Sequence, residues 1–137
     1  MRVVLDTNIL ISALWKPDGL EAAIIQLARE GKIACCVSHE LWEEYREVLS
    51  REKFANLSES AAQLLLDLSP QVTRVRPSKK VTWSGDDEDN RVLECLQESG
   101  AEYLITGNLR HFPAEWEGAR IVNARTFFTI RATEAPP

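Results

Sequence analysis

Short apolar runs that alternate with helical patterns limit the fold of this chain more than any other feature. Segments 2–5, 33–37 and 103–106 are too short for helices and rich in residues that favour strands. Between the first two, apolar residues recur at helical spacing over 19–30 until Gly31 ends the pattern. This order of strand, helix and strand predicts an α/β fold, with a mostly parallel central sheet and helices on both faces.

The rest of the chain continues this alternation and predicts a single domain. The predicted elements are helices over 38–50, 58–69 and 87–99, strands over 71–75 and 120–122, and a closing helix around 126–130. Ser38 and Asn123 are the predicted caps of the first and the last of these helices. We therefore expect one three-layer domain over residues 1–131, followed by a disordered C-terminal tail over residues 132–137.

The composition of the chain is typical of a soluble domain from a reducing compartment. The chain has 137 residues and a formal net charge of −5, which is typical of one soluble domain. Three cysteines cannot all pair, and Cys35 adjoins Cys36 inside an apolar run, so a reducing cytoplasm is the expected compartment. The apolar stretches are shorter than the roughly 20 residues of a membrane span, and the N-terminus opens directly on a strand pattern. Neither membrane insertion nor export is therefore expected.

Acidic side chains occupy positions that the predicted fold would place at one edge of the sheet. Asp6 ends the first predicted strand, where sheets of this kind bind ligands, although it also fits the cap of a helix over 8–14. On the helix over 38–50, steps of about 100° place Glu44 only about 40° from the apolar residue Val48. The other glutamates of this helix are expected to form a solvated face. Glu44 is therefore the glutamate that we expect in a site.

Asp89 breaks the pattern of a solvated acidic loop and helix start over 85–90. It shares the spacing i, i+3, i+4, i+7 with three apolar residues and so occupies the core-facing stripe of its helix. An acid among apolar neighbours must be paired, hydrogen-bonded or bound to a metal. Asp86 lies about 60° from Asp89 on the same helix and is a second candidate acid.

Asn108 follows Gly107 at the end of another predicted strand. The pair most simply forms a turn, but its position also makes Asn108 a candidate oxygen ligand beside the three acids. No lysine or arginine directly adjoins these four oxygen donors in the sequence, so a hard divalent cation is their expected neutralising partner. Mg²⁺ or Mn²⁺ suits such donors, whereas zinc is disfavoured because the two histidines show no ligand spacing with each other or with the cysteines.

Five motifs spread over nearly the whole chain occur in a specific order and spacing. They are Val-Val-Leu-Asp-Thr-Asn at 3–8, Ser38 with Glu-Tyr-Arg-Glu-Val-Leu at 44–49, residues 86–90 with Leu-Glu-Cys at 93–95, Tyr-Leu-Ile-Thr-Gly-Asn at 103–108, and His-Phe-Pro at 111–113. Together they resemble the PIN domain family, metal-dependent ribonucleases that are common as toxins of type II toxin-antitoxin operons. The resemblance implies a three-layer PIN-like fold with an acidic pocket at the strand ends that holds Mg²⁺ or Mn²⁺.

The resemblance also implies roles for individual residues. Asp6, Glu44, Asp89 and Asn108 would form the catalytic and metal-binding set, with Asp86 as a further metal ligand. Asn108 departs from the wider family, in which this position is typically a fourth Asp. The implied reaction is hydrolysis of RNA phosphodiester bonds by water that the cation activates.

Residues around this set would support it and contact the substrate. Asn8 and Thr106 would hydrogen-bond the carboxylates, although turn and cap roles also fit both residues. Arg110 and His111 are the expected substrate contacts, while the basic stretch over 74–80 fits either an RNA contact or a solvated loop. The resemblance further implies an RNA substrate and a small antitoxin partner, and it is compatible with a homodimer.

One alternative function remains open at this point. Asn108 lacks the negative charge of a fourth Asp, which would weaken a second metal site. The alternative is a PIN-fold binding module with weak or no nuclease activity.

Overall fold

A six-stranded sheet forms the centre of the protein, for which the computed structural model describes residues 1–134. The strands are β1 (Arg2–Leu5), β2 (Ala34–Val37), β3 (Thr73–Arg74), β4 (Tyr103–Ile105), β5 (Glu115–Trp116) and β6 (Ala119–Val122). They lie in the order β3-β2-β1-β4-β6-β5, and every neighbouring pair is parallel except β5 with β6. The carboxyl ends of five strands therefore gather at one edge of the sheet.

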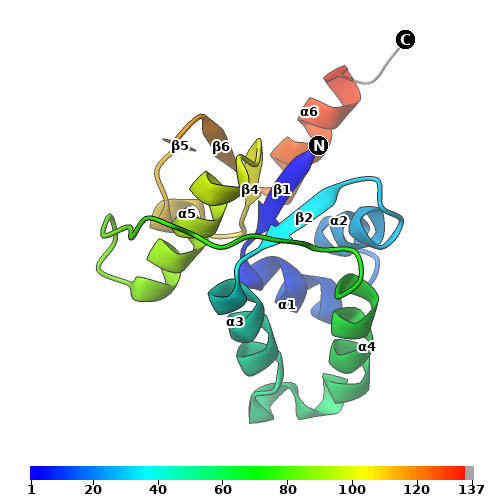
Figure 1. Ribbon diagram of the computed structural model, residues 1–137. Helices are drawn as coiled ribbons and strands as arrows, with labels where there is room; N and C mark the ends of the chain where they lie inside the picture. The colour runs from blue at the N-terminus through cyan, green and yellow to red at the C-terminus, as the bar shows by residue number, and fades with distance from the viewer. Residues whose placement is uncertain (135–137) are drawn as a thin grey trace.

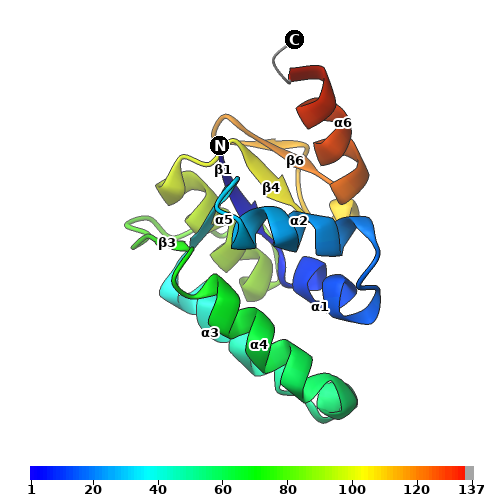
Figure 2. The same cartoon turned by 90° about the vertical axis from the view of Figure 1, so that its right-hand side faces the viewer.

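Helices cover both faces of this sheet, which confirms the three-layer α/β fold expected from the sequence. They are α1 (Thr7–Trp15), α2 (Leu20–Arg29), α3 (His39–Leu49), α4 (Ser58–Leu68), α5 (Asp87–Ser99) and α6 (Ala124–Glu134), with two short 3₁₀ segments, η1 (Glu52–Leu57) and η2 (Leu109–His111). Figures 1 and 2 show α5 on one face of the sheet and α2 with α6 on the other. The pair α3 and α4 extends away from the sheet.

Strand β1 shows how apolar packing places the first acid of the chain. Val3, Val4 and Leu5 are at most 1% exposed, because helices cover both faces of the central strands. Asp6 follows directly and lies at the carboxyl edge. The helices that flank this edge begin where the sequence predicts: Ser38 accepts the N–H of Leu41 (3.1 Å) as the cap of α3.

The segment between β3 and α5, residues 75–86 and here called the strap, runs back along α5 (Figure 1). Side chains of α5 spaced four residues apart accept strap N–H groups: Glu98 that of Ser78 (2.8 Å), Glu94 that of Val81 (2.9 Å) and Asn90 that of Ser84 (2.8 Å). Asn90 also donates to the carbonyl of Ser84 (2.8 Å). These contacts attach the strap to one face of α5 and lead the chain to Asp86, the N-cap of that helix.

The end of the chain differs from the sequence expectation. Helix α6 continues through residues 132–134, which were expected to belong to a disordered tail, because no helix breaker precedes Pro136. The hydroxyl of Thr133 donates to the carbonyl of Ile130 (2.9 Å) in this last turn. Residues 135–137 of the expected tail lie outside the described residues.

Three further features complete the description of the fold. Strand β5, which the sequence analysis did not predict, joins β6 through Glu117 (φ 49°) and Gly118 (φ 85°), a tight turn that needs the left-handed backbone. All three cysteines are buried and free of disulfide bonds in the described part of the chain. Within residues 1–134, no helix is both long and apolar enough to span a membrane.

Candidate functional site

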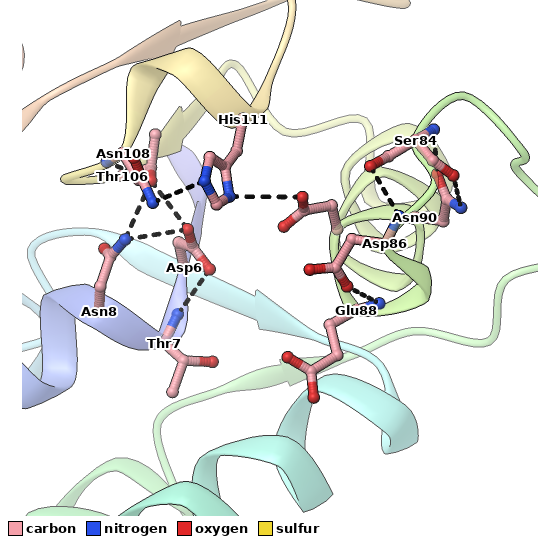
Figure 3. Close-up of polar contacts among 11 residues, drawn as sticks. Asp6, Thr7, Asn8, Ser84, Asp86, Glu88, Asn90, Thr106, Asn108 and His111 are labelled. Carbon is pink, nitrogen blue, oxygen red and sulfur yellow. Dashed lines mark hydrogen bonds and ion pairs between the residues drawn. The ribbon is translucent and has the colours of Figure 1, made fainter.

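The candidate site is a cavity of about 220 Å³ at the carboxyl edge of the sheet, beside α1, α3 and the start of α5. Its lining residues are Asp6, Thr7, Asn8, Ile11, Glu44, Val48, Arg51, Asp86, Glu88, Asp89 and His111. Carboxylates from three separate parts of the chain meet here, and Figure 3 shows Asp6 and Asp86 facing each other across the space. The three acids singled out in the sequence, Asp6, Glu44 and Asp89, therefore share one cavity.

Asp6 caps α1 and also lines the cavity. Its Oδ1 accepts the N–H of Thr7 (2.9 Å) as the cap of α1. Its Oδ2 accepts from the hydroxyl of Thr106 (2.8 Å) and from the side-chain amide of Asn8 (3.2 Å). Burial raises the pKa of Asp6 above its ordinary value, while the hydrogen bonds from Thr106 and Thr7 oppose the rise. The carboxylate is thus held in one orientation at the cavity wall.

Glu44 faces the cavity from α3. It is partly buried and accepts a short hydrogen bond from the hydroxyl of Thr7, whereas the neighbouring Glu43 is exposed and pairs with Arg46 (3.1 Å). Burial raises the pKa of Glu44 to about 7, although the hydrogen bond from Thr7 lowers it. Nearby acids, among them Glu88 and Asp6, add to the rise. Glu44 is therefore the glutamate of α3 that lines this cavity, as its helical phase predicts.

Asp89 and Asp86 enter the cavity from the first turn of α5. The side chain of Asp89 is 14% exposed, and burial, followed by the charge of Asp86, raises its pKa. Asp86 is exposed, and its Oδ1 accepts the N–H of Glu88 (2.9 Å) as the cap of α5. Asp86 thus has a structural role at the cap and lies at the rim of the cavity.

The turn that follows β4 connects two of these acids. Thr106, buried at its start, donates to Asp6 and accepts the N–H of Asn108 (3.0 Å). His111, at its end, lies on the cavity wall with Nδ1 3.5 Å from Oδ2 of Asp89. Asn108 lies beside the wall, and its amide nitrogen is 3.1 Å from Nε2 of His111 (Figure 3). The amide nitrogen of Asn108 is therefore directed at the imidazole of His111.

Three polar residues of the cavity wall were missed by the sequence analysis. Thr7 orients Glu44, and its only sequence signal is its place inside the opening motif. Glu88 lies in the stretch over 85–90 whose composition indicates a solvated acidic loop and helix start, yet it lines the cavity. Arg51 lies just past the end of α3, where helical periodicity carries no information, whereas the expected substrate contact Arg110 is exposed and does not line the cavity.

The donor set is suited to a hard divalent cation. Within residues 1–134, no three Asp, Glu, His or Cys side chains converge closely enough to hold a metal ion by themselves. Mg²⁺ does not require such convergence, since it is usually bound through one or two carboxylates and keeps several waters. Burial raises the pKa values of Asp6, Glu44 and Asp89, so a cation in the cavity would stabilise their ionised forms. The residues therefore fit Mg²⁺ or Mn²⁺ in their chemistry.

Known proteins resemble this chain in sequence and in fold. Over 111 residues the chain is 30% identical to the uncharacterized protein MJ1680 of Methanocaldococcus jannaschii, an alignment that covers 79% of this chain and 71% of that protein. A chain in the crystal structure of VapBC2 from Rickettsia felis, bound to a DNA fragment from their promoter, has a similar fold. That similarity has a TM-score of 0.60 and covers 90% of this chain and 98% of the other, at 16% sequence identity.

The PIN domain family matches residues 2–110, which include β1, the acids of α3 and α5, and the start of the turn after β4. The match thus covers most of the chain and the candidate site. We conclude that this chain belongs to the PIN domain family.

Proposed function

We propose that this protein is a metal-dependent endoribonuclease that uses Mg²⁺ or Mn²⁺, and that it is the toxin of a toxin-antitoxin pair. The observation that carries the proposal is the meeting of Asp6, Glu44 and Asp89 at one cavity, although they come from three separate elements. Membership of the PIN domain family supports the same chemistry. Paired or clustered carboxylates of this kind are the usual means of holding a hard cation beside a phosphodiester.

One or two of Asp6, Glu44 and Asp89 would contact the cation directly, and the remaining carboxylates, with Asp86 at the rim, would bind waters that the cation keeps. When bound, the cation would neutralise charge on the phosphodiester and lower the pKa of a bound water. Burial of the three carboxylates strengthens their interaction with a cation, because less solvent screens it.

The protein's own contribution is to orient these carboxylates before a ligand arrives. Thr106 and Asn8 hold one oxygen of Asp6, and Thr7 holds the carboxylate of Glu44. Such supporting hydrogen bonds reduce the reorganisation that binding requires. Loss of Thr106 or Thr7 is therefore expected to weaken cation binding even though neither would touch the cation.

An RNA strand would approach an acidic cavity, so its binding is expected to depend on the cation. Arg51 on the cavity wall and the exposed Arg110 are the proposed phosphate contacts. Both ring nitrogens of His111 instead face protein groups, Asp89 and Asn108. Arg51 is held by Glu47 through two contacts, of 3.2 Å from Nε and 2.9 Å from Nη2. This pairing keeps the guanidinium close to the end of α3.

A small antitoxin is the proposed protein partner. The similar fold of a chain in the R. felis VapBC2 structure supports this assignment. A partner segment with basic side chains would complement the acids of the cavity and the net charge of −5. Co-expression with the product of the neighbouring gene tests the pairing, and a protein that purifies alone under those conditions would contradict it.

Cleavage of a fluorophore-quencher single-stranded RNA tests the nuclease assignment. We expect cleavage with Mg²⁺ or Mn²⁺ and none in EDTA, and a loss of at least about 100-fold in Glu44→Gln and Asp89→Asn. The matched controls are Glu43→Gln and Asp87→Asn, exposed residues of the same helices that are not part of the cavity wall. Both controls should cleave like the wild type.

Calorimetric titration with Mn²⁺ measures cation binding independently of RNA cleavage. Mn²⁺ binding that is lost in Glu44→Gln, without RNA cleavage by the wild type, would support the alternative of a binding module. Equal losses of activity in Glu44→Gln and Glu43→Gln would contradict the assignment of this cavity as the active site.

A further inference from the structure

The turn after β4 is tied to the site at the level of its backbone. The N–H of Asn108 donates to the hydroxyl of Thr106, the N–H of Gly107 to Oδ1 of Asn8, and the N–H of His111 to the carbonyl of Asn108, each at 3.0 Å. Asn108 and His111 therefore lie at the two ends of one 3₁₀ turn, in which side chains three residues apart face each other. The backbone hydrogen bonds of the turn therefore hold the side chains of Asn108 and His111 close to each other.

His111 lies between two groups of opposite hydrogen-bonding character (Figure 3). Its Nδ1 is 3.5 Å from Oδ2 of Asp89, and its Nε2 is 3.1 Å from Nδ2 of Asn108. An ionised carboxylate only accepts hydrogen bonds, so Asp89 favours a proton on Nδ1. An amide NH₂ group only donates, so Asn108 requires a lone pair on Nε2. Both neighbours therefore favour the same neutral tautomer, the one that is less stable for a free imidazole in water.

We propose that Asn108 is a positioning residue that acts through His111: its amide donates to Nε2 and keeps the ring as the neutral Nδ1–H tautomer facing Asp89. A carboxylate at position 108 would accept from Nε2 and so place a proton there. With Asn108, this side of the cavity presents a neutral donor to Asp89 and adds no further negative charge.

Imidazole ¹⁵N chemical shifts of the metal-free protein at mildly alkaline pH test the tautomer. We expect a protonated Nδ1 and an unprotonated Nε2 for His111, with the exposed His39 as internal reference. Asn108→Ala should move His111 towards the Nε2–H form that free imidazole prefers, and Asn108→Asp should place a proton on Nε2. Leu109→Ala, an exposed neighbour in the same turn, is the matched control and should leave the tautomer unchanged.

Two results would overturn the proposal. One is a wild-type His111 with its proton on Nε2 and none on Nδ1, a measurement that needs no variant to fold. The other is an identical tautomer in the wild type and in Asn108→Ala. Neither measurement uses RNA or a metal. The result for the His111 tautomer is therefore independent of the result for nuclease activity.

A double-mutant cycle tests whether Asn108 acts through His111, and this part rests on the proposed metal site. Asn108→Ala and His111→Ala should each weaken Mn²⁺ binding about 10-fold, and the double variant should lose no more than either single variant. A direct ligand role for Asn108 would instead give additive losses. Additive losses would therefore overturn the claim that Asn108 acts through His111.

Discussion

Removal of the buried carboxylate of Glu94 should loosen the strap from α5 and destabilise the whole domain. Glu94 is 5% exposed, accepts the N–H of Val81 (2.9 Å) and pairs with Arg91 (2.6 Å). Loss of a charged hydrogen-bond acceptor for a buried N–H costs about 2 kcal/mol, and the partly exposed Arg91 left without its partner adds roughly 1 kcal/mol. Glu94→Ala should therefore lower the free energy of unfolding by about 3 kcal/mol, or Tm by roughly 10 °C in a chain of this size.

Glu98 provides a matched control one turn later on the same helix. It makes the same kind of contact with the strap, to the N–H of Ser78 (2.8 Å), but it is exposed, so Glu98→Ala should cost no more than about 0.5 kcal/mol. Glu94→Gln keeps the shape of the side chain and an acceptor oxygen, so its loss in free energy of unfolding should lie between those of Glu94→Ala and Glu98→Ala. Urea denaturation followed by circular dichroism measures all three variants. Equal destabilisation by Glu94→Ala and Glu98→Ala would refute the argument that burial sets the size of the effect.

Three further predictions concern groups whose pKa values are raised by burial. The pKa of Glu44 rises from 4.5 to about 7 on folding. Protonation of Glu44 therefore stabilises the folded protein fully below pH 4.5, and this contribution is lost as the pH rises through 7. Glu44→Gln should make the free energy of unfolding, measured in EDTA, less dependent on pH in this range. Asp6→Asn should leave the metal-free protein equally or more stable in thermal melts, because it removes a desolvated charge and keeps the cap, while Mn²⁺ should stabilise this variant less than the wild type. A large loss of Tm without metal would show that the carboxylate of Asp6 is mainly structural. Burial raises the pKa values of Cys35 and Cys95 to about 12, so a thiol reagent at neutral pH should modify them only after denaturation, and rapid labelling of the folded protein would contradict this.

The acids of the site could be predicted because their positions follow from local periodicity. Asp6 ends an apolar strand, and Glu44 and Asp89 lie on or beside the apolar stripes of two amphipathic helices. A strand repeats every two residues and a helix every 3.6, so the sequence alone determines which side chains face the core. Parallel strands then bring their carboxyl ends to one edge, which made the common cavity of these acids predictable.

Other features depend on contacts between segments that are distant in the sequence. Arg51 lies past the end of α3 and reaches the cavity wall through the packing of that helix, and Glu94 meets Val81 through the path of the strap. The amide of Asn108 meets His111 because the turn that carries both is tied to Thr106 and to Asn8. Irregular segments have no repeating geometry, so their side-chain directions are set by the elements against which they pack. The sequence by itself therefore determined the fold class and the three central acids, and only the tertiary structure decided which neighbours orient them.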